Sequence, residues 1–547
     1  MHELKPMLFS TLKGYSAKQL LSDLTAGVIV AIIALPLSIA LALASGVSPE
    51  QGIYTAIIAG FLISMFGGSR VQIAGPTAAF ATIVAGIVAK NGLSGLCIAT
   101  VLAGIMLLLM GVFRLGSLIK YIPFTITTGF TAGIAVTIVI GQFKDFFGVR
   151  YPDSMPTIET VEKLKAFFAG ISTFNLHAFI VGAVCLAILI LMPKLTEKIP
   201  ASLIAVIAGI LMCKFLPLNV DTIGDLYTIS NKLPSLYIPT VTFDAVKTAL
   251  PDAFTIAILA AIESLLSCVV ADGMIHDKHR SNAELCAQGI GNIASALFGG
   301  IPATGAIART AANIKNGGKT PVAGMVHALV LLLVLIILMP YASLIPMPAI
   351  AAILFMVAYN MSGWRTFVNL LKTAPKSDIF VLLITFVLTV VFDLVIAIEA
   401  GMLLACILFM KRMSDETGLK KWKTTSIDND EHDRLLKVSK QIRIYEITGP
   451  LFFGAADKVA NIAIKSDTRC LILRMRSVPA LDVTAMNALN ELYARCKKSN
   501  ITLILSHVNN QPLKAMKKSG FIKKVGADNI KNNITEAINH AENLLSL

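Results

Sequence analysis

Two charged residues stand inside apolar stretches of this sequence. Glu263 lies within the apolar run 260–270, and Arg309 lies within the short interrupted segment 302–313. A charge in lipid costs about 2.5–3.5 kcal/mol on insertion scales, so such residues usually face a cavity or a partner and mark a pathway. We therefore predict that this region holds the substrate and coupling-ion site of a secondary transporter.

A pair of short apolar segments points to the same region. Each follows a break rich in glycine and proline, the motif GPT at 75–77 in one half of the chain and PATG at 302–305 in the other. Such paired breaks indicate half-helices at a midplane site of an inverted-repeat transporter. Two positive helix N-termini together with Arg309 favour an anion as the ligand. The alternative is that the breaks are ordinary kinks in packed helices.

The composition is that of a membrane protein. Of the 547 residues, 55% are hydrophobic and only 15% are charged, and many uncharged runs reach about 20 residues, the length that spans a bilayer. A β-barrel would show alternating segments of about 10 residues instead. The net charge of +14 is explained by Lys and Arg on the cytoplasmic side, so we expect no nucleic-acid partner.

The sequence offers no signs of an enzyme. It shows no nucleophile–base set and no nucleotide-binding loop. The eight cysteines are scattered without a CxxC pair, which predicts neither a disulfide framework nor a metal site. We therefore expect a protein that catalyses no reaction and needs no cofactor.

Fourteen apolar runs form two sets of seven, a first repeat at 23–216 and a second at 252–410. Lys and Arg gather in the loops on one side, which places both termini in the cytoplasm. Because seven is odd, the second set is inverted relative to the first. We predict an all-α polytopic membrane domain over 23–410, preceded by a cytoplasmic segment, 1–22.

The composition changes after residue 410. The segment 411–435 is charged and is predicted to be a linker, whereas strand-like and helix-like runs alternate through 436–547. This alternation predicts a small sheet with helices packed on it, a cytoplasmic α/β domain. Asp482 is predicted to cap the helix that follows it.

Taken together, several motifs resemble the SulP sulfate-permease family of anion transporters. They are DLTAG (23–27), LP (35–36), GPTA (75–78), AIESLL (261–266), VVADGM (269–274), NAELCAQGIGN (282–292), ART (308–310) and GGKT (317–320). The tail resembles the STAS domain that ends such transporters. The resemblance implies a 7+7 inverted repeat with a core and a gate domain, a homodimer, and an elevator-like motion of the core.

The resemblance also implies roles for individual residues. Glu263 matches the acidic position that couples transport to a cation. The anion is expected among Pro36, Ser38, Thr77, Ala78, Ser267, Thr304, Gly305, Ala308 and Arg309. Ser267 shares a helix face with Glu263 by the i, i+4 rule. Some members carry Ser where this chain has Ala308, which removes one hydroxyl donor.

The coupling ion is expected to be a proton. Glu at 263 resembles the proton-coupled branch, whereas Asp with a nearby Thr resembles the sodium-coupled bicarbonate branch. A carboxylate in a cavity poor in water also binds a proton more readily than one in water. The alternative is that Glu263 and Arg309 form a permanent structural ion pair.

The block 263–313 most resembles bacterial carriers of C4-dicarboxylates. We therefore expect a proton-coupled symporter of a C4-dicarboxylate or an inorganic anion in the bacterial inner membrane. Three alternative functions stay open: a sulfate or bicarbonate transporter coupled to protons or sodium, an uncoupled anion channel, and a STAS-based signalling protein. So does a regulatory partner of the STAS domain.

Other polar residues receive structural expectations. Asp272, Asp277, His279 and Glu284 are interpreted as helix caps or solvated loop charges at a helix junction. His327, inside an apolar run, is interpreted as a core histidine with its hydrogen bonds satisfied.

Overall fold

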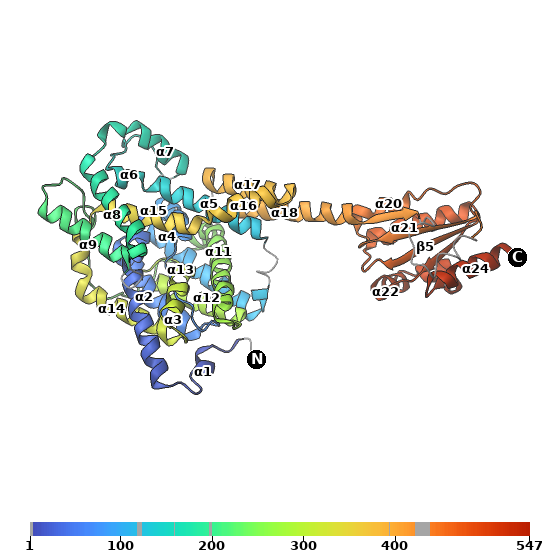
Figure 1. The fold of residues 1–547 in the computed structure, drawn as a ribbon, viewed down its shortest axis with the longest axis horizontal. Coiled ribbons are helices and arrows are strands. Elements are labelled where there is room, and N and C mark those ends of the chain that lie inside the picture. The colour runs from blue at the N-terminus through green and yellow to red at the C-terminus, as the bar shows by residue number, and fades with distance from the viewer. Residues whose placement is uncertain are drawn as a thin grey trace. The chain divides into compact units, whose positions relative to one another are not determined.

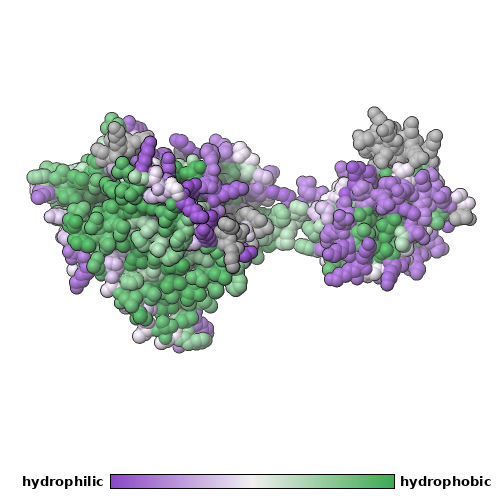
Figure 2. Space-filling view, turned by 90° about the horizontal axis from the view of Figure 1, so that it is seen from below, coloured by the Kyte–Doolittle hydropathy of each residue, from purple (hydrophilic) through white to green (hydrophobic). Residues whose placement is uncertain are grey.

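The computed structural model describes residues 4–117, 123–157, 159–195, 200–392, 394–421 and 438–546. The chain divides into two units, Met1–Met402 and Leu403–Leu547 (Figure 1). The face of the first unit seen in Figure 2 is broadly hydrophobic, whereas that of the second unit is mostly hydrophilic. Most of the predicted linker, residues 422–435, lies outside the described residues.

The first unit is almost entirely helical, and its helices coincide with the predicted apolar runs. They are α2 (Ala17–Ala44), α3 (Pro49–Phe66), α4 (Ala78–Val112), α5 (Phe124–Gly141), α8 (Leu176–Leu195), α9 (Ala201–Phe215), α11 (Phe243–Ile275), α12 (Ser281–Leu297), α13 (Ile307–Lys315), α14 (Val322–Leu338), α15 (Met347–Ser362), α17 (Lys376–Val391) and α18 (Leu394–Glu416), which continues into the second unit. Among the described residues, 7 helical segments are long and apolar enough to cross a membrane.

Shorter elements connect these helices. They are α1 (Leu8–Thr11), α6 (Phe143–Phe147), α7 (Thr160–Ala169), η3 (Ile171–Thr173), α10 (Ile223–Leu226), η4 (Met339–Leu344) and α16 (Trp364–Thr373).

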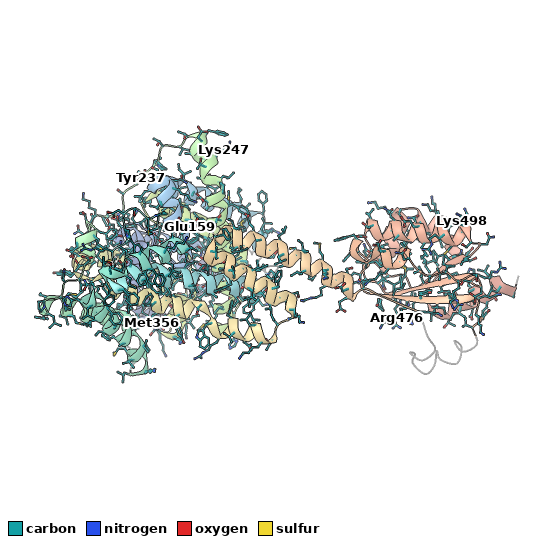
Figure 3. All side chains as sticks on the ribbon, turned by 90° about the horizontal axis from the view of Figure 1, so that it is seen from above. Glu159, Tyr237, Lys247, Met356, Arg476 and Lys498 are labelled. Carbon is teal, nitrogen blue, oxygen red and sulfur yellow. The ribbon has the colours of Figure 1, made fainter. Side chains whose placement is uncertain are left out.

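The helix α4 contains two of the predicted runs. Gly92 has φ 66° and ψ −173°, a non-helical conformation that separates the half-helix 78–91 from the rest of α4. This conformation favours glycine because it has no Cβ. Tyr237, labelled in Figure 3, joins a distant loop to this kink, since its hydroxyl lies 2.6 Å from Ser94 Oγ.

The helices of the first unit pack in two groups. In one group α12 packs against α3 and α4, α11 against α4 and α13, and α14 against α2 and α3. In the other group α5 packs against α15 and α17, and α8 against α9 and α15. The first group contains both half-helices, as expected of a core domain, and it contacts the second group through α2 with α15 and through α4 with α5.

A short strand pair lies where the two half-helices begin. The strands β1 (Ala74–Gly75) and β2 (Thr304–Gly305) are antiparallel, with Ala74 opposite Gly305 and Gly75 opposite Thr304. The half-helix of α4 follows β1 and α13 follows β2. The two helices therefore leave the strand pair in opposite directions with their N-termini toward it, which is the arrangement of an inverted repeat.

The second unit is a five-stranded sheet covered by helices, in the order β3-β4-β5-β6-β7. The strands are β3 (Gly418–Lys421), β4 (Ile442–Thr448), β5 (Cys470–Ser477), β6 (Thr502–Ser506) and β7 (Ile530–Lys531). The strand β3 is antiparallel to β4, and the other neighbours are parallel. The sheet therefore takes its first strand from the segment 411–435, which the sequence predicted as a linker.

Helices pack on both faces of this sheet. They are η5 (Phe453–Ala455), α20 (Ala456–Ala460), α21 (Val483–Lys498), α22 (Asn510–Lys518), α23 (Phe521–Val525), η6 (Ala527–Asn529) and α24 (Ile534–Ser546). Alternate residues of β5 contribute to two apolar clusters, with Leu471 facing α21 and Ile472 facing α24. Figure 3 labels Arg476 in β5 and Lys498 at the end of α21. The predicted cap is confirmed, because Asp482 Oδ1 accepts a hydrogen bond from Ala485 N (2.8 Å).

Candidate functional site

Glu263 lies beside the N-terminus of the half-helix in α4. Thr77 is the N-cap residue of α4, and its hydroxyl donates a hydrogen bond to Glu263 Oε2 (3.0 Å). Both side chains are partly exposed, whereas their neighbours Ala78 and Ser264 are buried. The carboxyl group of Glu263 is therefore held at a helix N-terminus, on a side chain that is not fully buried.

The two half-helices present N-termini without a side-chain cap. Thr77 makes no capping hydrogen bond to α4 because its hydroxyl is directed at Glu263, and Ala306, the N-cap of α13, has no polar side chain. Ala308, in the first turn of α13, is exposed. Uncapped N–H groups and the helix dipole make such ends anion-binding sites.

Arg309 is buried behind these helix ends and is 3% exposed. Its Nη2 donates hydrogen bonds to the carbonyl oxygen of Pro76 (3.2 Å) and to Ser38 Oγ (3.4 Å). The carbonyl of Pro76 belongs to the peptide that precedes Thr77, so the guanidinium reaches the base of the α4 half-helix. Among the described residues it forms no ion pair with Glu263, which disfavours the permanent pair considered from the sequence.

Hydroxyl groups of α11 hold β2 and α13 in place. Ser264 Oγ lies 2.6 Å from Thr304 Oγ1 and accepts a hydrogen bond from Gly305 N (3.0 Å). Ser267 donates to Thr310 Oγ1 (3.4 Å), which also accepts from the backbone N of Ile73 in front of β1 (3.0 Å). Ser267 is therefore directed at α13 rather than at the partly exposed side of Glu263.

The structure brings nearly all of the predicted site residues around the strand pair. Pro36 and Ser38 are buried in α2, Thr77 and Ala78 begin α4, Thr304 and Gly305 form β2, Ala308 and Arg309 lie in the first turn of α13, and Glu263 and Ser267 lie on α11.

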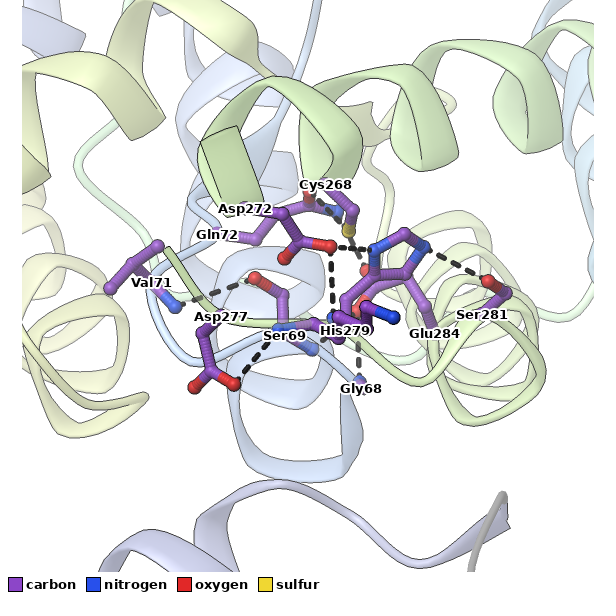
Figure 4. Close-up of polar contacts among 11 residues, drawn as sticks. Gly68, Ser69, Val71, Gln72, Cys268, Asp272, Asp277, His279, Ser281 and Glu284 are labelled. Carbon is purple, nitrogen blue, oxygen red and sulfur yellow. Dashed lines mark hydrogen bonds and ion pairs between the residues drawn. The ribbon is translucent and has the colours of Figure 1, made fainter. Parts of the chain in front are cut away.

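A buried cluster missed by the sequence reasoning holds the loop in front of β1. Glu284 is 1% exposed and accepts hydrogen bonds from Gly68 N (2.9 Å), Gln72 Nε2 (2.7 Å) and Gln288 Nε2 (2.9 Å). The interpretation of Glu284 as a solvated loop charge is therefore wrong. The thiol of Cys268 donates to Gln72 Oε1 (2.9 Å), which ties the same loop to α11 (Figure 4). The only local signal in the sequence was Gln288, one turn after Glu284, because Gln72 is 212 residues away.

The junction between α11 and α12 is held by further polar contacts, visible in Figure 4. Asp272 Oδ2 accepts hydrogen bonds from His279 N (3.0 Å) and pairs with His279 Nδ1 (2.7 Å), while Nε2 of the same ring lies 2.9 Å from Ser281 Oγ. Burial acts to raise the pKa of Asp277, but hydrogen bonds from Arg70 and from the backbone of Lys278, together with the charges of Arg70 and Arg280, outweigh it and lower that pKa. These contacts position the helices and lie outside the candidate site.

Comparison with known proteins identifies the family. The sulfate permease family profile matches residues 20–385, and the STAS domain profile matches residues 434–537. The chain belongs to the sulfate permease family. It is 41% identical over 519 residues to the putative sulfate transporter YvdB of Bacillus subtilis, covering 94% of this chain and 96% of that protein. It is 30% identical over 539 residues to the bicarbonate transporter BicA of Picosynechococcus, covering 95% of this chain and 94% of that protein.

Solved structures show the same architecture. The transmembrane domain of a cyanobacterial bicarbonate transporter BicA matches with a TM-score of 0.63 and 30% identity, over 71% of this chain and 98% of that one. The murine Solute Carrier 26 family member A9 anion transporter matches with a TM-score of 0.87 over 98% of this chain and 94% of that one. At 18% identity the latter shows the fold alone. The predicted fold class, a helical membrane domain with a STAS domain, is confirmed.

The family membership settles the broad function. This sulfate permease homologue is a multi-pass membrane protein that transports anions, and it is a transporter rather than an enzyme.

Proposed function

We propose that this protein is a proton-coupled anion symporter in which Glu263 carries the proton. The observation that carries the proposal is the hydrogen bond from Thr77 to Glu263 at the N-terminus of the α4 half-helix. The N-terminus of the α4 half-helix thus lies beside the carboxyl group of Glu263 and also binds the anion. Protonation of Glu263 removes a negative charge from that end, so an incoming anion is repelled less and proton and anion bind together.

The anion is held by the two half-helix N-termini and by the charge of Arg309. The N–H groups of α4 from Ala78 onward and those of α13 near Ala308 are the donors, as expected for an anion at helix ends. Arg309 supplies a fixed positive charge, and its described partners, Ser38 and Pro76, are both uncharged. The bound anion is therefore the charge that compensates the buried guanidinium.

The substrate is an oxyanion. The names of the relatives, a putative sulfate transporter and a bicarbonate transporter, favour an inorganic anion over the C4-dicarboxylate that the block 263–313 suggested. Two helix ends and one arginine suit all three ligands, so the choice is made by direct competition in the assay below.

The two packing groups of helices support an elevator-like mechanism. Both half-helices, Glu263 and Arg309 belong to one group, so that group can carry the site as a body against the other. The basic residues in alternate loops support an inner-membrane protein with both termini in the cytoplasm. The proposal also includes that the protein works as a homodimer and that its STAS domain binds a regulatory partner.

Uptake into proteoliposomes tests the proposal. Purified protein is reconstituted and given an inward proton gradient with radiolabelled sulfate, bicarbonate or succinate. We expect accumulation of one anion that collapses when an ionophore removes the gradient. Glu263→Gln keeps the size and hydrogen bonding of the side chain but cannot release a proton, so gradient-driven accumulation should be lost while anion binding persists.

Asp277→Asn is the matched control, because it makes the same chemical change at the helix junction, outside the site. It should accumulate the anion like the wild type. Full gradient dependence in Glu263→Gln would contradict the role of Glu263, and downhill anion flux unaffected by the gradient in the wild type would indicate a channel.

A further inference from the structure

Three buried polar groups line the packed region around α3 and the strand pair. Arg309 Nη1, both ring nitrogens of His327 and Ser64 Oγ have no hydrogen-bond partner among the described residues. The three side chains are 3%, 0% and 5% exposed. Buried polar atoms nearly always have a partner, in the protein or in ordered water. No described residue supplies the hydrogen bonds expected of His327 as a satisfied core histidine.

One face of α3 places these groups in a row. Ala56, Gly60 and Ser64 are spaced by four residues and so lie on the same side of the helix. A methyl group built on Gly75 would lie 2.5 Å from Arg309 Nη1 and 3.6 Å from the Cα and Cβ of Ala56, so Nη1 and Ala56 both border Gly75 of β1.

His327 follows one turn further along this face. A methyl group built on Gly60 would lie 3.8 Å from Cε1 and Nδ1 of His327 and 3.2 Å from the carbonyl oxygen of Ala74 in β1. The ring is therefore beside Gly60 and near β1, whose next residue is Gly75. Among the described residues, Arg309 is the charged group that acts electrostatically on this ring.

Ser64 completes the row. A methyl group built on Gly324, one turn before His327 in α14, would collide with Ser64 Oγ. The hydroxyl therefore lies between α3 and α14, one turn from the ring on both helices. An uncharged imidazole has one donor and one acceptor, a hydroxyl has both, and Nη1 is a donor only. Ordered water is the usual partner of buried groups that no protein atom satisfies.

We propose that His327 is a positioning residue for Arg309, holding the guanidinium through buried water shared with Ser64. In this arrangement Nη1 donates a hydrogen bond to the water, and the water donates one to a nitrogen of the uncharged ring. Nη2 donates to Pro76 and Ser38. Arg309 is thereby fixed from both sides at the base of the α4 half-helix. This inference deepens the proposed function and rests on it, because it gives His327 a role in anion affinity and not in proton transport.

The test compares His327→Leu with His327→Gln in the proteoliposome assay, with whichever of sulfate, bicarbonate or succinate the wild type accumulates. Leucine fills the space without a polar atom, and glutamine restores an acceptor. We expect His327→Leu to raise KM about tenfold, the effect of losing one hydrogen bond to a charged group, with kcat within about twofold. His327→Gln should recover most of the affinity and keep the wild-type dependence on pH.

A double-mutant cycle separates positioning from general packing. In an Arg309→Ala background His327→Leu should cause no further rise in KM, because the group it positions is gone. Ser64→Ala is a milder variant, expected to raise KM about two- to threefold, and it keeps the idea testable if His327→Leu does not fold.

Several results would overturn the inference. The first is an unchanged KM in His327→Leu or Ser64→Ala. The second is an equal rise in KM in His327→Leu and His327→Gln. The third is a rise in KM from His327→Leu that is as large in the Arg309→Ala background as in the wild type. A wild type that moves no anion would instead refute the proposed function. Transport that depends on Arg309 but not on His327 would refute only this inference.

Discussion

Replacing Arg309 with alanine removes the fixed positive charge of the candidate anion site. The guanidinium lies 3.2 Å from the carbonyl oxygen of Pro76, and the α4 half-helix begins two residues later. An anion at the first N–H groups of that helix is then about 7 Å from the charge, and at an effective dielectric constant of about 20 the attraction is about 2 kcal/mol per unit of anion charge.

This energy converts into a measurable loss of affinity. About 2 kcal/mol corresponds to about a 30-fold increase in Kd for a monovalent anion, and a divalent anion should lose about a thousandfold. The factor by which Arg309→Ala raises Kd therefore reports the charge of the bound anion. We would measure Kd by equilibrium binding of radiolabelled sulfate to purified protein at low ionic strength, with bicarbonate as the monovalent competitor.

Two variants complete this experiment. Arg309→Lys retains the charge and should keep most of the affinity, although it loses the two hydrogen bonds that Nη2 donates to Pro76 and Ser38. Arg70→Ala removes a positive charge from the helix junction, where Arg70 pairs with Asp277 at 2.9 Å, and should leave Kd unchanged. A Kd for Arg309→Ala within about twofold of the wild type would remove Arg309 from the site.

Two further predictions concern the frame around the site. Asp23 is buried and accepts hydrogen bonds from Lys319 N (2.7 Å), Thr320 Oγ1 (2.6 Å) and Tyr15 Oη (2.8 Å), so Asp23→Asn should destabilise the protein by about 2–4 kcal/mol and lower its Tm; a wild-type Tm would contradict this. Gly305→Ala should lower Tm and reduce uptake, because the new methyl group meets the side chain of Gln72, which Glu284 and Cys268 hold in place. Gly86→Ala, where nothing lies within 4 Å, is its control, and equal effects in both variants would show that the contact with Gln72 is irrelevant.

The helical frame was predictable from the sequence. Apolar runs long enough to span a bilayer are a local property, and α2, α8 and α14 coincide with such runs. The paired breaks before Ala78 and Ile307 were also visible, because glycine and proline interrupt a helix wherever they occur. The same local signals placed Glu263 and Arg309 in the candidate site.

The sequence was less informative about polar groups. Glu284 was interpreted as solvated, and the structure buries it against Gly68, Gln72 and Gln288. His327 was interpreted as satisfied, and no described residue bonds its ring. The burial of a polar side chain depends on which helix covers it, and hydropathy along one segment does not contain that information.

Hydropathy, helix breaks and family motifs thus determined from the sequence alone that this chain is a two-part anion transporter with half-helices at its centre. Only the tertiary structure decided that Gly75 lies opposite Thr304, that Thr77 bonds Glu263, and that Arg309 bonds Ser38 rather than Glu263. The physical reason is distance along the chain. These partners are separated by well over a hundred residues, so their pairing follows from how the helices pack and not from local propensity.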